Sequence, residues 1–201
     1  MTVEVLVLYY SRHGATELLA REVCHGIDSV AGAASRLRTV PPVSATSEQS
    51  EDSVPESGPP YATTADLTEC QGLVLGSPTR FGNMSAGLKH FFDGTVGEWL
   101  AGALAGKPAG LFTSSGSLHG GQETTLMTMA VPLLHHGMLI VGVPYTEAAL
   151  SATTTGGTPY GASHVTWNQD SDRLSDDETT IARALGRRVA DIAVRLSNGG
   201  D

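Results

Sequence analysis

The sequence predicts an α/β three-layer fold, in which a parallel sheet of about five strands lies between two layers of helices. Four short apolar runs, at residues 3–10, 72–76, 109–114 and 138–143, are bounded by turn residues. Three of them are nearly continuous in apolar residues, which is typical of strands buried on both faces of a parallel sheet. Helical patterns separate the runs, and strands that alternate with helices favour right-handed crossovers that cover both faces.

The helices and a fifth strand follow from local patterns. Residues 34–40 alternate apolar and polar side chains, which predicts a more exposed strand. Helices are expected at about 14–30, 85–92 and 122–136, and the first has apolar residues at three- and four-residue spacing that form one face. The last helix is the clearest, because it begins with the capping box 175–178 and continues with an apolar stripe of Ile181, Leu185, Val189, Ile192 and Leu196.

Two segments interrupt this alternation. Residues 41–65 are rich in Pro, Ser, Thr, Glu and Gly, which predicts an acidic and mobile surface loop. Residues 146–173 also lack a regular pattern, but the turn residues at 156–161 favour an ordered connection. We expect residues 1–201 to form a single domain, since this length fits one well-buried core.

Composition restricts the class of partner. The chain has 201 residues, 40% of them apolar, and a net charge of -9, which disfavours binding to nucleic acid or to an anionic membrane surface. No basic and apolar leader precedes the first strand, and no apolar run approaches the ~20 residues of a membrane helix, so no membrane insertion is expected. Cys24 and Cys70 are too few for a disulfide framework, which favours the cytoplasm.

A short polar turn follows the first apolar run. Its residues are Ser11, Arg12, His13, Gly14, Ala15 and Thr16, and a helix is expected to begin within it. A strand that enters such a turn directs free N–H groups and hydroxyls at an anion on the helix N-terminus. The turn has no Lys, unlike a triphosphate loop, and lacks the glycine spacing of a dinucleotide loop. It therefore predicts a site for a small monophosphate, although Ser11 and Thr16 are equally suited to capping the helix.

Two more polar, glycine-rich loops follow later strands, at residues 77–85 and 114–121. Ligands of open parallel sheets bind outside the carboxyl ends of the strands, where the strand order reverses. The three loops together can surround one ligand that has a phosphate end and an aromatic end.

The chain resembles the WrbA family of NAD(P)H:quinone oxidoreductases, which have a flavodoxin-like fold and bind FMN. The likeness lies in Gly-Ser-Pro-Thr-Arg-Phe-Gly-Asn-Met at 76–84, with the turn at 11–16 before it. Further similar segments follow in the same order along nearly the whole chain, at 97–99, 119–123, 135–138 and 156–162. An ordered set of this kind is far more specific than a phosphate loop alone.

The resemblance implies a set of FMN-binding residues and a substrate pocket. The FMN contacts would be Ser11, Arg12, His13, Gly14, Ala15, Thr16, Pro78, Thr79, Arg80, Phe81, Gly82, Asn83, Ser114, Ser115, Gly116, Ser117, Leu118, His119 and His135. Trp99, His13 and His135 would line the substrate pocket. His13 departs from the family pattern, in which a Tyr is common at this nicotinamide-side position. No side chain is expected to act as a catalytic nucleophile, because the flavin carries the chemistry.

The implied reaction passes two electrons from NAD(P)H to the flavin and then to a quinone, and the two substrates use one pocket in turn. The resemblance also implies a homodimer or homotetramer whose active site includes residues of neighbouring subunits. Two alternatives remain at this point. One is a one-electron flavodoxin-like carrier, and the other is a flavin-binding regulatory protein with slow turnover.

Some of these residues also have purely structural interpretations. Trp99 could fill a core gap or a subunit contact, and one of the adjacent His135 and His136 could simply complement the helix end before Gly137. Adjacent histidines point in different directions on a helix and have no partner four residues away, so we assign no metal site.

Overall fold

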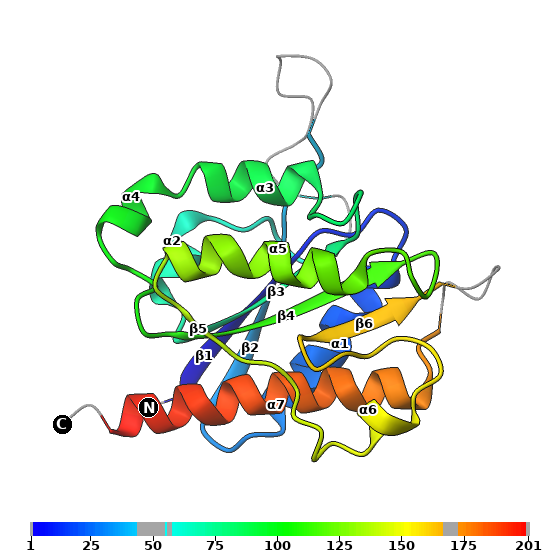
Figure 1. Ribbon diagram of the computed structural model, residues 1–201. Coiled ribbons are helices and arrows are strands. Elements are labelled where there is room, and N and C mark those ends of the chain that lie inside the picture. The colour runs from blue at the N-terminus through cyan, green and yellow to red at the C-terminus, as the bar shows by residue number, and fades with distance from the viewer. Residues whose placement is uncertain (1, 44–54, 56–57, 167–172, 200–201) are drawn as a thin grey trace.

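The computed structural model describes residues 2–43, 55, 58–166 and 173–199 (Figure 1). Its centre is one parallel sheet with the strand order β2-β1-β3-β4-β5, and a sixth strand, β6, also pairs with β4. The strands are β1 (Val3–Tyr9), β2 (Ala33–Thr39), β3 (Gly72–Pro78), β4 (Pro108–Ser115), β5 (Leu139–Ile140) and β6 (Ala162–Val165). The expected α/β fold with a parallel sheet is confirmed.

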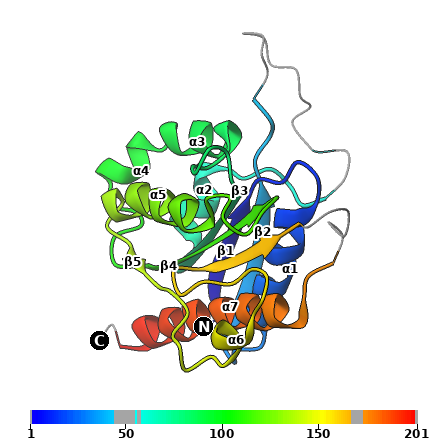
Figure 2. The same cartoon turned by 45° about the vertical axis from the view of Figure 1, so that its right-hand side comes forward.

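Helices cover both faces of the sheet, as Figures 1 and 2 show. One layer contains α1 (Ala15–Asp28), α6 (Ala149–Ala152) and α7 (Asp176–Asn198); the other contains α2 (Thr64–Glu69), α3 (Ala86–Asp93), α4 (Val96–Leu100) and α5 (Gln122–His135). The capping box of α7 is present, with Ser175 Oγ accepting the N–H of Glu178 at 3.1 Å. In the described part of the chain, none of the helices is long and apolar enough to cross a bilayer.

The sheet divides the hydrophobic core into two clusters. Val5 and Val7 of β1 contribute to the cluster beneath α1 and α7, whereas Leu6 and Leu8 contribute to the cluster beneath α3 and α5. All four side chains are fully buried. Successive side chains of a strand point to opposite faces, so an uninterrupted apolar run is what a strand covered on both sides requires. In contrast, every residue of the edge strand β2 is half-buried, which confirms the expected exposed strand.

The fifth strand position differs from the expectation. The sequence predicts a strand at 138–143, but β5 has only two residues, which pair with the start of β4. The chain then leaves the sheet and returns as β6, which pairs with the end of β4. The segment 146–173 therefore supplies half of a strand as well as α6. Periodicity missed β6 because its sequence, Ala-Ser-His-Val, is short and half polar.

The loop predicted at 41–65 extends too far at its C-terminal end, because α2 begins at Thr64. Asp66 Oδ2 accepts the backbone N–H of Thr63 at 2.8 Å, which satisfies one free donor at the helix start. The pattern Thr-x-x-Asp at 63–66 is a capping signal that could have revealed this helix. Most of the remaining loop lies outside the described residues.

Candidate functional site

The strand order places a crevice at the carboxyl edge of the sheet. From β1 the chain continues to β2 on one side, whereas β3, β4 and β5 follow on the other side. The loops that leave neighbouring strands β1 and β3 therefore diverge, and this divergence is where open α/β sheets bind ligands. All three loops singled out in the sequence end at this edge.

The β1–α1 loop forms a tight turn that opens the N-terminus of α1. Gly14 is the residue before the helix and has a φ of +89°, a conformation that favours glycine. Its N–H donates to Ser11 Oγ at 3.1 Å. No side chain caps α1, so the structure does not support the capping interpretation of Ser11 and Thr16. The first N–H groups of a helix have no intrahelical acceptor, and Ala15 and Thr16 at the start of α1 line the crevice, so this helix end is suited to bind an anion.

Thr16 connects this loop to the loop after β4. Its Oγ1 lies 2.9 Å from Ser114 Oγ, and both side chains are almost fully buried. Ser115 is also buried, and its hydroxyl donates to the carbonyl of Ser117 at 2.8 Å. Buried hydroxyls that already share one hydrogen bond are held in fixed directions, and each retains capacity for a further partner.

The β3–α3 loop is a tight turn stabilised by two backbone hydrogen bonds. Arg80 N–H donates to Asn83 O at 2.8 Å, and Asn83 N–H donates to Arg80 O at 3.1 Å. The central residues Phe81 and Gly82 both have positive φ, as in a type I′ turn. Phe81 is the only described non-glycine residue with this conformation, and its side chain is fully exposed beside the crevice. A strained and exposed aromatic residue is a functional candidate.

These three loops enclose one cavity of about 340 Å³, which we call the cradle cavity. Of the predicted FMN-binding residues, it is lined by Ser11, Arg12, His13, Ala15, Thr16, Pro78, Thr79, Arg80, Ser114, Ser115 and Gly116. Gly14, Phe81, Gly82, Ser117, Leu118 and His119 lie in the same loops but do not line it. Sequence reasoning missed Thr166, which follows β6 and also lines the cavity. No motif marked Thr166, because β6 itself was not predicted.

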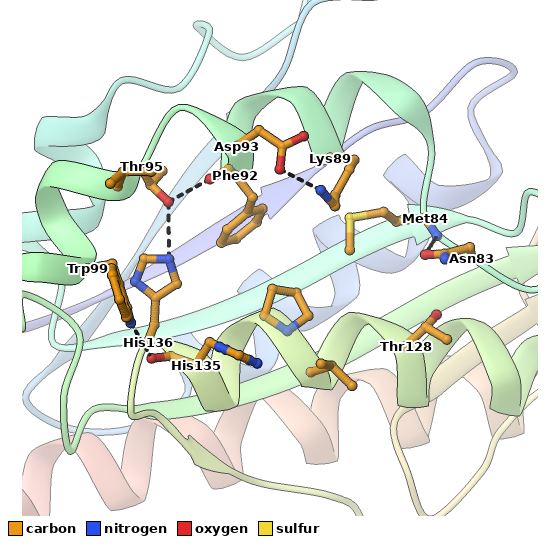
Figure 3. Close-up of a pocket in the computed structure, with 13 residues that line it drawn as sticks. Asn83, Met84, Lys89, Phe92, Asp93, Thr95, Trp99, Thr128, His135 and His136 are labelled. Carbon is orange, nitrogen blue, oxygen red and sulfur yellow. Dashed lines mark hydrogen bonds and ion pairs between the residues drawn. The ribbon is translucent and has the colours of Figure 1, made fainter.

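A second cavity of about 650 Å³ lies between α3, α4 and α5, and we call it the apolar cavity (Figure 3). Trp99 and His135, the two predicted substrate residues outside the cradle loops, both line it. Trp99 Nε1 donates to the carbonyl oxygen of His135 at 2.8 Å, and about half of the Trp99 side chain is exposed. Neither residue lines the cradle cavity of the same chain. Asn83, which was predicted to contact FMN, lines the apolar cavity as well.

The two adjacent histidines have different environments. His135, the last residue of α5, is exposed, whereas His136 is buried and its Nε2 lies 3.0 Å from Thr95 Oγ1. Burial lowers the pKa of His136 and favours the neutral ring. His136 is therefore the structural member of the pair, since it connects the end of α5 to the start of α4. His135 remains free to contact a ligand or a second chain.

A buried carboxylate stabilises the edge strand beside the cradle. Glu178 at the start of α7 accepts hydrogen bonds from the N–H of Gly156 at 2.8 Å and of Ser175 at 2.9 Å, and its Oε2 lies 2.9 Å from His164 Nδ1. Burial alone would raise the pKa of this carboxyl group, but the bonds from His164 and the backbone outweigh it and lower the pKa to about 2. His164 belongs to β6, whose pairing with β4 positions Thr166 at the cavity.

The sheet order and the crevice define a flavodoxin-like protein. A flavodoxin, WrbA-like protein from Agrobacterium tumefaciens superposes with a TM-score of 0.66 at 24% identity, covering 96% of this chain and 99% of that chain. A flavodoxin from the domain Archaea gives a TM-score of 0.63 at 17% identity, covering 96% and 99%. At these identities the likeness concerns the fold.

Sequence similarity identifies the family. Residues 1–151 match the family described as NADPH-dependent FMN reductase. A protein named NAD(P)H dehydrogenase (quinone) from Chromohalobacter salexigens is 44% identical, and one of the same name from Solidesulfovibrio magneticus is 39% identical; both alignments cover 96% of this chain and 98% of the relative. The chain belongs to the NADPH-dependent FMN reductase family, and the resemblance to the WrbA-type quinone reductases is confirmed.

Proposed function

We propose that this protein is an FMN-dependent, two-electron NAD(P)H:quinone oxidoreductase. The observation that carries the proposal is the meeting of three separate loops at one polar cavity, at the point where the strand order reverses. The names of the two curated relatives support the same reaction and the same two substrates.

The residues of the cradle cavity fit the phosphate of FMN. Thr16 and Ser114 supply buried hydroxyls, Ser11 a third hydroxyl, and the start of α1 supplies N–H groups and the positive end of a helix dipole. This donor set suits a small anion and needs no lysine. The turn at Gly14 leaves open space where a Cβ would project, so a ligand can approach the backbone closely.

The remaining loops would bind and tune the flavin ring. When bound, FMN supplies the redox chemistry, by accepting a hydride from NAD(P)H and reducing the quinone. Thr79 is held by Thr125, whose Oγ1 donates to Thr79 Oγ1 at 2.8 Å, and Thr79 N–H donates to the carbonyl of Ser114 at 2.8 Å. Arg80 would place a cation near the ring and stabilise the negative charge of its reduced form.

We also propose that the chain forms a homodimer or homotetramer through the helix layer around the apolar cavity. Large apolar side chains are exposed on α4, on α5 and on the strand β5 that contacts α5, namely Val96, Trp99, Leu100, Met127, Val131, Leu134, Leu139 and Ile140. Soluble monomers rarely expose an apolar patch of this extent. In such an assembly, Trp99 and His135 of one subunit would lie at the cradle cavity of a neighbouring subunit. Within a single chain, neither residue lines the cradle cavity.

The free cysteines Cys24 and Cys70 are both buried, which supports the proposed location in the reducing cytoplasm.

Anaerobic stopped-flow absorbance tests the proposed reaction. The FMN-loaded protein is mixed with NADH or NADPH, and then with benzoquinone. Complete loss of the flavin's visible absorbance, followed by rapid recovery with quinone, is expected. Absence of bleaching with both nucleotides would instead favour the slow regulatory alternative, and reoxidation in two separate one-electron steps would favour the carrier.

A further inference from the structure

A third cavity lies beside the cradle cavity, and we call it the cationic cavity. It has a volume of about 740 Å³ and is lined by Arg12 of the β1–α1 loop, Arg80 of the β3–α3 loop and Lys89 of α3. Arg12 and Arg80 also line the cradle cavity, so the two cavities adjoin. Lys89 also lines the apolar cavity on the other side. The cationic cavity therefore lies between the proposed flavin site and the cavity that contains Trp99.

The charges of this cavity are poorly compensated within the described residues. No acidic side chain lines it. Arg12 forms no ion pair there, and Arg80 Nη1 donates only to the carbonyl oxygen of Thr79, at 2.8 Å. Lys89 Nζ contacts Asp93 Oδ1 at 2.5 Å, and Figure 3 shows this pair at the rim of the apolar cavity. More than half of each side chain of the pair is exposed, so the ion pair is weak and can exchange for a better anion.

Such a cluster is unexpected on this chain as a whole. The chain has 12 Lys and Arg residues against 21 Asp and Glu residues, and its net charge of -9 repels anions in general. Three cations line this one cavity and none of its described lining residues is acidic, so its local charge is opposite in sign to the net charge of the chain. Guanidinium groups bind phosphate oxygens through paired hydrogen bonds, and an ammonium group adds a flexible point charge. The cavity is therefore suited to a phosphate-bearing ligand.

We propose that the cationic cavity binds a phosphate of the nicotinamide dinucleotide, with Lys89 as a residue that contacts it. The inference rests on the proposed function, because it places the dinucleotide beside the flavin. The flavin's own phosphate has a separate site among the buried hydroxyls of the cradle. A quinone has no phosphate and gains nothing from the three cations. The reduced dinucleotide carries a diphosphate, and in NADPH a 2′-phosphate as well, so it is the substrate that this cavity can select.

Binding of two dinucleotide fragments tests the inference. Isothermal titration calorimetry with FMN-loaded protein would measure the Kd of 2′,5′-ADP and of 5′-ADP. Lys89→Gln should weaken at least one of them about tenfold, as expected for loss of a charged hydrogen bond. Lys89→Arg, which keeps the charge, should stay within about threefold of the unmodified protein. Lys107→Gln is the matched control, because Lys107 is outside these cavities and its Nζ donates to the carbonyl of Thr68.

Each outcome decides the proposal. A loss confined to 2′,5′-ADP assigns the cavity to the 2′-phosphate and predicts a preference for NADPH, whereas a loss that includes 5′-ADP assigns it to the diphosphate. Unchanged binding in Lys89→Gln, or an equal loss in Lys107→Gln, overturns the inference.

The readout also separates this inference from the proposed function. Normal turnover with NAD(P)H and unweakened fragment binding in Lys89→Gln would refute the cationic cavity alone. Fragment binding that depends on Lys89, in a protein that does not oxidise NAD(P)H, would refute the proposed reaction alone.

Discussion

The cradle cavity and the apolar cavity differ in what holds their residues in place. In the cradle, the hydroxyls of Thr16 at the start of α1 and of Ser114 near the end of β4 bond to each other and are buried. In the apolar cavity, Trp99 and His135 come from helix ends, and both are exposed. The buried hydroxyls of the cradle are therefore positioned within one chain, whereas the apolar cavity presents apolar surface that a second chain is expected to cover. We therefore expect the cradle cavity to bind a ligand and the surface around the apolar cavity to form a subunit contact.

Gly14→Val should have the largest effect, and only on the cradle. Valine at a φ of +89° is strained by about 1–3 kcal/mol, and its side chain would project into the open space beside the turn. We expect FMN retention after purification to be lost, as measured by the flavin absorbance per protein. Gly97→Ala is the control, because Gly97 lacks a positive φ and its Cβ would also meet open space. Unchanged flavin content in Gly14→Val would contradict the assignment of the loop.

Introducing charge on α5 should affect only the subunit contact that we propose around the apolar cavity. The double variant Val131→Asp and Leu134→Asp places two carboxylates on side chains that are 52% and 58% exposed in the isolated chain. If this face is the subunit contact, burying each charge costs several kcal/mol, and light scattering should report the mass of one chain. Leu196→Asp on α7 has a comparable exposure, 48%, and should leave the mass unchanged. An oligomer that persists in the double variant would place the contact elsewhere.

Glu178→Gln should destabilise the edge of the cradle. The pKa of Glu178 is about 2 in the folded protein, below its ordinary value, so the charged carboxylate stabilises the fold above pH ~5 and this stabilisation is lost as the pH falls towards 2. We expect the free energy of unfolding at pH 7 to fall by about 3 kcal/mol, and its dependence on pH between 5 and 2 to flatten.

Chemical denaturation at several pH values would measure this effect. Asp176→Asn, at an exposed position of the same helix start, should cost less than about 1 kcal/mol. Equal losses in the two variants would mean that the contacts of Glu178 with His164 and the backbone contribute little.

Thr16→Val should have the smallest effect. It removes the hydrogen bond to Ser114 while keeping the shape of the side chain, and leaves the Ser114 hydroxyl without that partner. The Kd for FMN should rise about fivefold to tenfold, which corresponds to ~1 kcal/mol, in a titration of flavin fluorescence. Thr16→Ser, which keeps the hydroxyl, should restore most of the affinity. A Kd unchanged by Thr16→Val would remove this hydroxyl from the phosphate site.

The sequence was informative where a buried strand contains a long, nearly continuous apolar run. Runs such as residues 3–10 and 109–114 predicted strands with nearly correct bounds, because full burial requires continuous apolar residues. The loops that follow such strands were then placed at one edge of the sheet by topology alone. The residues expected within those loops were named through the resemblance to the WrbA family, and most of the residues that line the cradle cavity are among them.

Short strands with polar residues could not be found in this way, even where they are buried. β6 pairs through its backbone and contains His164, whose polar side chain breaks the apolar pattern although it is buried against Glu178. Thr166 was missed with it. The cationic cavity was not predicted for a different reason, since Arg12 is far in the sequence from Arg80 and Lys89 and meets them only through the strand order. Residues that come close together only in the folded protein leave no recognisable pattern in the local sequence.

The division of the fifth strand position between β5 and β6 has a consequence for the order of folding. β5 pairs with β4 across one intervening helix, whereas β6 must first close the longer excursion that contains α6. Longer loops lose more entropy on closure, so β6 is expected to dock on an already formed sheet. Thr166 and the outer wall of the cradle would then be the last part of the molecule to assemble. FMN would then bind to an almost completely folded protein and stabilise β6, the last strand to dock.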